Sequence, residues 1–325
     1  MAMSKSAQAA YKKAVKAKKK KKRGHWLLIQ KGDSFKEILS KIITQIAVVV
    51  LAGCIVILGN EARLMLETHQ LNTSLQYIYQ NLSSAVSNAV GGDTITPAAE
   101  ELLKINPDTV GWITIEGTNV NLPVVQRKAD NYEDGNMYYL THAFDGSNNK
   151  AGTILLDYRD TLTAKERSEN LVIYGHNQRD KSMFGDLAQY KHSLEFYQSH
   201  PTVTFSSNYR TDVYKIFAYF VTAINPEQTR DGFIFDYHNY INFDSNETYD
   251  TFVNLAMERS QIITDVDIKY GDEFITLSTC SNEFEPSRFV IMARKVREGE
   301  DPSVDVSKAY LNPNAKEPDW DVIYG

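Results

Sequence analysis

A segment without charged residues constrains this chain more than any other feature. Residues 42–58 are apolar except for Thr44, Gln45 and Gly53, and no charge follows before Glu61. A helix rises about 1.5 Å per residue, so a segment of this length can cross a hydrocarbon core about 30 Å thick. Residues 1–41 hold twelve Lys, one Arg, one Asp and one Glu, a net charge of +11, while the whole chain carries −6. The remainder therefore carries −17, and the positive-inside rule predicts a cytoplasmic N-terminus and an external C-terminal part.

The flanking sequence favours an uncleaved anchor over a signal peptide. The basic region is longer than that of a signal peptide, and no small-x-small cleavage site follows the apolar run. The lysines of residues 18–22 orient the anchor and attract anionic lipid. Nucleic-acid binding is disfavoured, because the run adjoins the membrane segment and contains no interleaved aromatic residue.

The region after the anchor begins with predicted helices. Apolar residues at spacings of four, three and four give one helical stripe, which we expect to pack on the following domain or on a partner. The members of this stripe are Leu71, Leu75, Ile78 and Leu82. Gly91 and Gly92 end the predicted helix. Thr96 and Pro97 then predict the N-cap and first position of a short helix to about Ile105.

From about residue 112 the pattern changes to short β-type runs separated by turn residues. The runs are 112–115, 119–125, 152–157, 170–174, 202–206, 212–224, 273–280 and 288–296. Eight such runs, mostly antiparallel, predict a mainly β fold with a closed eight-stranded barrel. Helical spacing of apolar residues at 246–259 predicts a helix inserted before the seventh run, and residues after 298 look like extended surface chain.

The chain has only two cysteines, and they are predicted to lie in different environments. Cys54 belongs to the apolar segment and Cys280 ends a strand on the external side. They cannot form an intrachain disulfide, and the seven histidines show no metal-binding spacing. No metal or cofactor is expected. Alternation along the strand places Cys280 on the same face as Thr276 and Ser278, which leaves a reactive thiol and an inert one as alternatives.

Two further residues at strand ends could act with this thiol. His176 follows the buried run 171–174, and Arg288 opens the strand after Cys280. Histidine can carry a proton, and arginine can favour a thiolate or hold a developing oxyanion. His142 is the other histidine that context leaves open, whereas His25, His69, His192, His200 and His238 lie in cytoplasmic, stalk or polar loop positions. A strand-end His bonded to backbone and a surface Arg remain the simpler alternatives.

These residues lie in motifs that resemble one family. The sequence TLSTC at 276–280 resembles the TLxTC motif of sortases, GHN at 175–177 is similar to the motif around their histidine, and Arg288 falls where their arginine does. Further stretches resemble class B sortases over about residues 98–297. They are LKINPDTVGW (103–112), YYL (138–140), AGTILLDYR (151–159) and MFGDL (183–187). Class C is less similar, because the Asp-Pro-aromatic lid and the second membrane segment of that class are missing from this sequence.

The resemblance implies a membrane-anchored cysteine transpeptidase. Cys280 would attack the carbonyl after the Thr of a sorting motif such as Asn-Pro-x-Thr, His176 would protonate the leaving amine, and Arg288 would hold substrate or oxyanion. An amine of a cell-wall precursor or a pilin would then resolve the thioacyl enzyme. Ser278, Tyr174 and Asn177 are predicted substrate contacts. The expected segments are a basic cytoplasmic region (1–40), a transmembrane anchor (41–59), a membrane-proximal helical segment (60–97), the catalytic domain (98–300) and a tail (301–325).

Two alternatives remain at this point. A surface cysteine protease would hydrolyse its acyl enzyme, although papain-like patterns around the cysteine are missing. A non-catalytic scaffold would use the same barrel for binding only, although the Cys, His and Arg positions are all filled.

Overall fold

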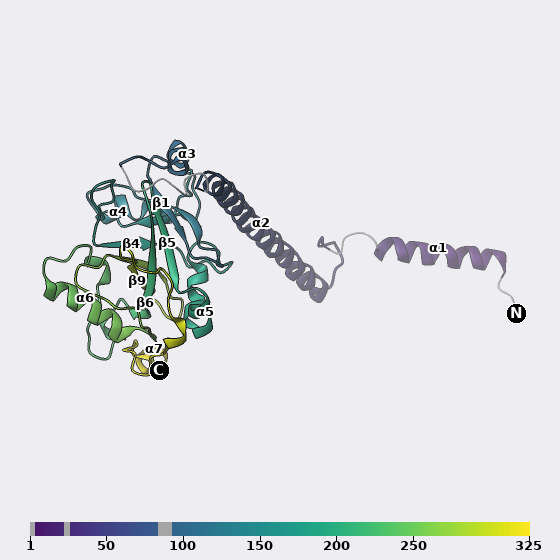
Figure 1. Ribbon diagram of the computed structural model, residues 1–325. Helices are drawn as coiled ribbons and strands as arrows, with labels where there is room; N and C mark the ends of the chain where they lie inside the picture. Colours follow the sequence, from purple (N-terminus) through teal and green to yellow (C-terminus); the bar gives the residue numbers. More distant parts are fainter. Residues whose placement is uncertain (1–3, 23–26, 84–92) are drawn as a thin grey trace. The chain divides into compact units, whose positions relative to one another are not determined.

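The computed structural model describes residues 4–22, 27–83 and 93–325, and it divides into two compact units, residues 1–65 and 66–325 (Figure 1). The first unit holds α1 (Lys5–Lys22) and the first part of α2 (Phe35–Ser83). Ser34 and Glu37 form a capping box at the start of α2, with the Ser34 backbone amide donating to the Glu37 carboxylate at 2.8 Å.

The predicted anchor lies wholly inside α2. Among the described residues α2 is the one helix long and apolar enough to cross a membrane, and its apolar stretch is not buried against protein. The helix continues without a break from the apolar stretch into the membrane-proximal region and ends at Ser83. The predicted break at Gly91 and Gly92 lies outside the described residues.

The second unit is built on a closed barrel in the order β1-β2-β3-β4-β8-β9-β6-β5. The prediction of a closed eight-stranded barrel is therefore confirmed. Six of the eight neighbouring pairs are antiparallel, while β2 pairs with β3 and β4 pairs with β8 in parallel. The strands are β1 (Thr109–Thr114), β2 (Asn121–Val125), β3 (Ile154–Leu156), β4 (Asn170–Tyr174), β5 (Thr202–Ser207), β6 (Thr211–Ala223), β8 (Phe274–Cys280) and β9 (Ser287–Lys295).

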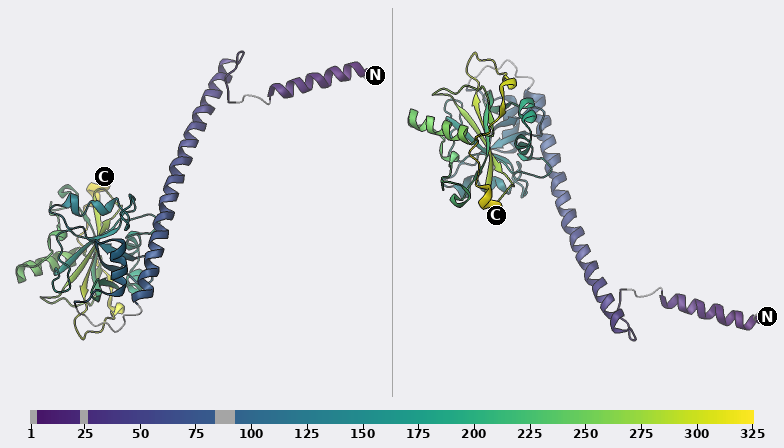
Figure 2. Two further views of the ribbon diagram at one scale, coloured as in Figure 1. Left: turned by 90° about the horizontal axis from the view of Figure 1, so that it is seen from above. Right: turned by 90° about the horizontal axis from the view of Figure 1, so that it is seen from below.

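Alternation along the strands separates an inner core from an outer one. All eight strands contribute to the inner cluster, to which Ile275 and Leu277 of β8 belong. The outer cluster joins β6, β8 and β9 to α6 (Asn246–Arg259), which lies on the outside of the barrel (Figure 2). The inserted helix has the predicted bounds. Thr276, Ser278 and Cys280 share one face of β8, as predicted, and this face points away from the barrel interior, which Ile275 and Leu277 fill.

The helices before β1 pack on the domain, one of the two arrangements expected for the apolar stripe. Leu75 is buried in a third cluster, and the rings of Tyr79 and Trp112 stack at 4.3 Å between centroids. α3 (Pro97–Ile105) has Thr96 as its N-cap, whose hydroxyl accepts from the Ala99 amide at 3.3 Å. Both predictions about this region are confirmed.

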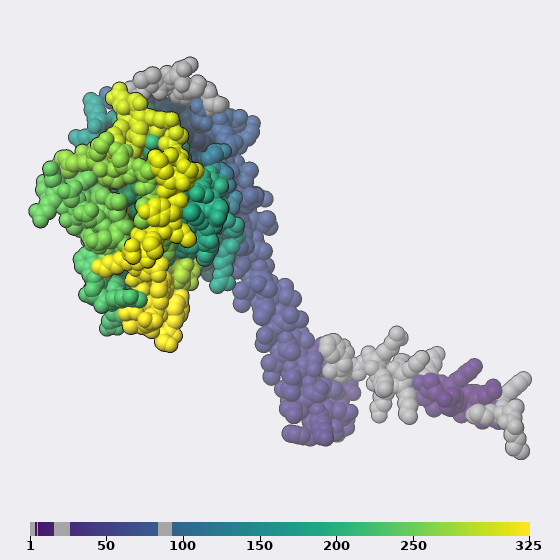
Figure 3. Space-filling view, turned by 60° about the horizontal axis from the view of Figure 1, so that its bottom comes forward, coloured from purple at the N-terminus to yellow at the C-terminus, as the bar shows by residue number. Residues whose placement is uncertain are grey.

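The C-terminal tail is more structured than predicted. It crosses the surface of the second unit as a continuous band (yellow in Figure 3). Its strand β10 (Tyr310–Leu311) pairs with β7 (Ile262–Ile263), and it ends in α7 (Trp320–Tyr324). The tail was predicted as extended surface chain; β10 and α7 are additions that the sequence did not indicate, because their contacts join positions far apart in the sequence and have no local signature. The remaining short helices are α4 (Tyr132–Gly135), η2 (Tyr138–Leu140), η3 (Gly185–Lys191), α5 (Leu194–Ser199), η4 (Pro226–Gln228), η5 (Tyr237–Asn239) and η6 (Val306–Lys308).

Candidate active site

Cys280 and Arg288 are directly opposite each other at the ends of β8 and β9. Side chains of opposed residues in an antiparallel pair point to the same face. The Arg288 guanidinium Nη1 lies 3.8 Å from the Cys280 sulfur and donates to the Ser287 carbonyl at 3.0 Å. The Cys280 thiol is exposed, unlike the rest of β8. The pair thus presents a reachable sulfur beside a fixed positive charge.

His176 is brought to the same place by the parallel pairing of β4 with β8. Tyr174 is opposite Ser278 in this register, so His176 and Cys280 each lie two residues beyond the last pair. The imidazole Nε2 lies 2.8 Å from the Leu140 carbonyl oxygen. A carbonyl can only accept, so Nε2 carries a hydrogen and Nδ1 is the nitrogen that can exchange a proton.

Gly175, between β4 and His176, is closely packed on both sides. A Cβ at this position would overlap Ile154 Cδ1 and come within 2.8 Å of Phe184 Cδ2. The Phe184 amide also donates to the His176 carbonyl at 2.9 Å. Close packing on both sides therefore fixes the backbone that carries the imidazole.

The three predicted substrate contacts all make bonds within the chain. Asn177 Nδ2 donates to the Cys280 carbonyl at 2.8 Å, which joins the residue after His176 to the end of β8. The Ser278 hydroxyl lies 2.6 Å from the Tyr237 hydroxyl of η5. The Tyr174 hydroxyl donates to the Asp157 carboxylate at 2.9 Å. Each of these side chains already has a partner that orients it.

A buried polar network lies behind Ser278. Burial raises the pKa of Tyr237 to about 12, although Ser278 and the positive charge of Arg288 act in the opposite direction. Burial also opposes ionisation of Asp157, but hydrogen bonds from Arg159 outweigh it and hold the pKa of that carboxyl below its usual value. Burial and the Asp157 charge raise the pKa of Tyr174 well above its usual value. Asp157 is therefore ionised and both tyrosines are protonated at neutral pH.

Arg159 ties this network to the loop that carries Tyr237. Its guanidinium donates to Asp157 and also to the His238 carbonyl at 2.7 Å and the Asn239 side chain at 2.9 Å. Burial lowers the pKa of the His238 imidazole, an effect that Asp236 opposes. One arginine thus fastens η5 to the loop after β3.

The family model for the sortase domain matches residues 113–296 of this chain. This chain belongs to the sortase family. Staphylococcus aureus sortase B is 31% identical over 205 residues, which are 62% of this chain and 76% of that protein. Sortase B of Listeria monocytogenes is 31% identical over 217 residues, covering 65% and 79% of the two chains.

Solved structures agree with this sortase assignment. The substrate complex of S. aureus sortase B has a TM-score of 0.59 at 28% identity, over 71% of this chain and 97% of that one. Sortase B of Bacillus anthracis has a TM-score of 0.58 at 26% identity, over 72% and 99% of the two chains. The protein is thus a class B sortase, a cysteine transpeptidase of the cell surface.

His142, the other candidate histidine of this sortase, is oriented by Tyr138. The His142 ring stacks on Tyr138 with 4.0 Å between centroids, and its Nδ1 lies 2.8 Å from the Tyr138 carbonyl. In the described parts of the chain no group of three metal-ligating side chains occurs.

Sequence reasoning missed the residues that support the site. Tyr237 and Arg159 lie in or near irregular loops, where neither periodicity nor spacing marks them. Asp157 directly follows the buried strand β3 and could have been found as a polar residue at a strand end. Lys191, which donates to the Ser281 carbonyl at 2.8 Å, carries no local signal.

Proposed function

We propose that Cys280, His176 and Arg288 carry out the transpeptidation of this sortase. The observation that carries the proposal is the 3.8 Å contact between Arg288 Nη1 and the Cys280 sulfur at paired strand ends. The thiolate of Cys280 attacks the carbonyl carbon of the sorting-motif threonine. The resulting oxyanion lies beside the Arg288 guanidinium, whose fixed charge stabilises it more than the neutral ground-state carbonyl.

His176 handles the protons of both steps. As the tetrahedral intermediate collapses, the carbon–nitrogen bond breaks and the leaving amine takes a proton from protonated His176, leaving a thioester on Cys280. The incoming amine attacks this thioester, gives its proton to neutral His176, and expels the Cys280 thiolate. Nδ1 is the proton-carrying atom, because Nε2 stays bonded to the Leu140 carbonyl.

Ser278, Tyr174 and Asn177 are proposed to contact the substrate. Each is already oriented by one bond, so contact with a peptide costs little additional side-chain entropy. A hydroxyl accepts as well as donates, which leaves Ser278 and Tyr174 able to take part in a second bond.

The proposed donor substrates are surface proteins with an Asn-Pro-x-Thr or related sorting motif. The proposed acceptor is an amine of a cell-wall precursor or a pilin. One similar sortase B was solved in complex with triglycine, a peptide with a free amino terminus. An acceptor of that chemistry would suit the exposed Cys280 thioester.

We also propose that α2 anchors the enzyme, with the N-terminus in the cytoplasm and the barrel outside. The uncharged length of α2 and the lysines before it support this topology. On this proposal residues 1–40 are cytoplasmic, 41–59 span the bilayer, 60–97 lie near the membrane, 98–300 form the catalytic domain and 301–325 the tail. Protease treatment of intact cells should remove the barrel but not an N-terminal epitope tag; protection of the barrel would contradict the topology.

The reaction is tested with the full chain in detergent micelles and a fluorogenic peptide containing Asn-Pro-x-Thr. With triglycine as amine, we expect a ligated product and a thioacyl adduct on Cys280 that mass spectrometry can map. Cys280→Ala should abolish both. An adduct on another residue, or unchanged ligation in Cys280→Ala, would reject the assignment, and a Leu-Pro-x-Thr peptide measures the motif preference.

A further inference from the structure

Residues 281–286 form the hairpin tip that joins the two members of the catalytic pair. Cys280 precedes this tip and Arg288 follows it after one residue, so a shift of the tip moves both side chains. On one side the tip is held by Lys191, which donates to the Ser281 carbonyl at 2.8 Å. The hydroxyls of Ser281 and Ser287 lie 2.8 Å apart and close the base of the tip.

The C-terminal helix α7 holds the tip from another side. The ring of Trp320 meets the ring of Phe284 edge to face, with 5.6 Å between centroids. The Tyr324 hydroxyl donates to the Glu283 carbonyl at 2.7 Å. The rings of Trp320 and Tyr324 stack on each other, so the two contacts form one unit.

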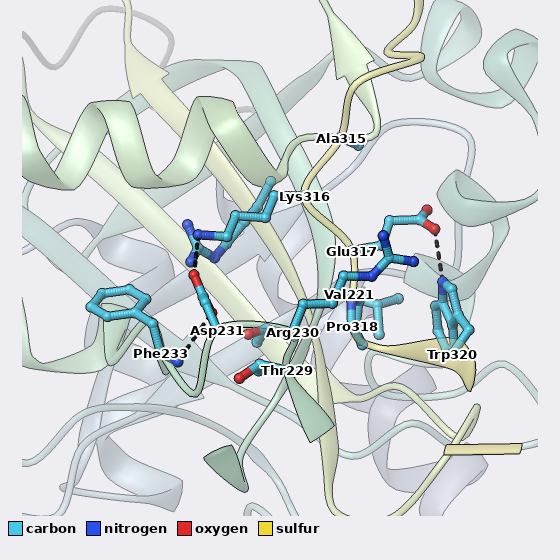
Figure 4. Close-up of a pocket in the computed structure, with 12 residues that line it drawn as sticks. Val221, Thr229, Arg230, Asp231, Phe233, Ala315, Lys316, Glu317, Pro318 and Trp320 are labelled. Carbon is cyan, nitrogen blue, oxygen red and sulfur yellow. Dashed lines mark hydrogen bonds and ion pairs between the residues drawn. The ribbon is translucent and has the colours of Figure 1, made fainter. Parts of the chain in front are cut away.

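The chain before α7 is itself fastened to the domain. The Asp319 amide donates to the Gln228 carbonyl at 2.9 Å, and Lys316 pairs with Asp231 at 2.6 Å. Figure 4 shows residues 315–320 lying along the segment that contains Asp231, with the Trp320 indole bonded to Glu317. The tail therefore reaches the hairpin tip on a defined path.

A continuous series of contacts leads from α7 to Arg288. Trp320 packs on Phe284, and the Phe284 carbonyl accepts a hydrogen bond from the Ser287 hydroxyl. The Ser287 carbonyl in turn accepts from Arg288 Nη1 at 3.0 Å, and the same nitrogen lies 3.8 Å from the Cys280 sulfur. The position of the guanidinium thus depends on the position of the tip.

We propose that Trp320 and Tyr324 are positioning residues that hold Arg288 in register with the thiol. The inference rests on the proposed roles of Cys280 and Arg288. No α7 side chain is fully buried, although Trp320 packs in part against the inner core, and the Trp320 ring and the Tyr324 hydroxyl both contact the hairpin tip. α7 also lies beyond residues 113–296, which the family model matches.

The test measures kcat and KM for transpeptidation by the full chain in detergent micelles. Trp320→Ala should lower kcat/KM about tenfold, and Tyr324→Phe, which removes only one hydroxyl, about threefold. Trp320→Phe keeps an aromatic edge and should restore most of the loss. Tyr310→Ala is the matched control, because Tyr310 is an exposed aromatic residue of the same tail whose strand pairs with β7, away from the hairpin tip. Its kcat/KM should stay within twofold of the parent.

A double-mutant cycle distinguishes positioning of Arg288 by α7 from a general contribution of α7 to stability. If α7 acts through Arg288, Trp320→Ala should change the kcat/KM of an Arg288→Lys enzyme less than twofold, because lysine cannot reproduce the forked contact. A full tenfold further loss in that background would overturn the inference, as would parent-like activity of both Trp320→Ala and Tyr324→Phe. Unchanged activity of Arg288→Lys alone would instead contradict the proposed role of Arg288. Thermal melting followed by circular dichroism checks that each variant is folded. If Trp320→Ala is not folded, the cycle is measured with Tyr324→Phe and Arg288→Lys.

Discussion

Asn177 donates a 2.8 Å hydrogen bond to the carbonyl of Cys280, so the loop that begins with the histidine is tied to the backbone of the nucleophile. His176 follows strand β4, and Cys280 is the last residue of strand β8. These two strands are parallel neighbours, although about a hundred residues separate them in the chain. The bond keeps the ends of β4 and β8 in register beyond their last paired residues, Tyr174 and Ser278.

Asn177→Ala should lower kcat/KM by roughly three- to tenfold, because a net hydrogen bond contributes about 0.5–1.5 kcal/mol. We expect the loss mainly in kcat, since the bond positions the catalytic backbone. Asn314→Ala, a change at an exposed tail residue, is the control in the same assay. An unchanged kcat in Asn177→Ala would mean that the ends of β4 and β8 stay in register without this bond.

Tyr237→Phe should reduce both stability and activity, because it leaves the buried Ser278 hydroxyl without its 2.6 Å partner. The expected loss in the free energy of unfolding is about 1–2 kcal/mol. In a cycle with Ser278→Ala, the two changes should be less than additive when unfolding is followed in urea. Tyr270→Phe, at an exposed tyrosine, should be neutral, and simple additivity of the Tyr237 and Ser278 changes would show that the hydroxyls do not interact.

Gly175→Ala should destabilise the enzyme by about 1–3 kcal/mol and impair catalysis, because a Cβ there overlaps Ile154 Cδ1. Ile154→Val removes that atom. The double variant should therefore recover part of the thermal stability and part of kcat relative to Gly175→Ala. If Ile154→Val gives no recovery, the contact with Phe184 rather than Ile154 limits this position.

Glu300 should make the free energy of unfolding depend on pH in the acidic range. Arg294, which is buried, bonds both carboxylate oxygens, and Lys215 lies 2.7 Å away. These bonds hold the pKa of the Glu300 carboxyl below its ordinary value, although burial acts in the opposite direction. The contribution of Glu300 to the free energy of unfolding is therefore fully present above the pKa of the unfolded chain, about 4.3. It is lost as the pH falls toward the pKa of the folded state.

Glu300→Gln should accordingly lower the free energy of unfolding at pH 7 by about 2 kcal/mol and have a smaller effect at pH 3. Urea unfolding at the two pH values measures the difference. Glu298→Gln, at an exposed neighbour, is the control. An effect of equal size at both pH values would rule out an electrostatic origin.

Local patterns predicted the barrel strands and the strand-end residues. Alternation placed Cys280 on the same strand face as Thr276 and Ser278, and a buried run placed His176 at the end of a strand. The relation between those two residues could not be predicted from the pattern alone, because it depends on the parallel pairing of β4 with β8, and no local signal specifies such a long-range partner.

The residues that support the site could not be predicted from local patterns for the same reason. Tyr237 reaches Ser278 from an irregular segment, and Trp320 reaches Phe284 from a tail that sequence alone marked as extended chain. In each contact, one partner comes from a segment without periodicity. Their chemistry becomes visible only when the fold brings the segments together.

The insertion between β6 and β8 has a consequence for how such an enzyme can change. It leaves the barrel at Ala223, opposite Ser287 beside the thiol, and re-enters at Phe274, opposite Arg294 at the far end of β9. The strands that carry Cys280 and Arg288 are paired with each other along their whole length, but Tyr237 of the insertion bonds Ser278 of β8. An exchange of residues 224–273 must therefore retain Tyr237, or the strand that carries the nucleophile loses a support together with the old insertion.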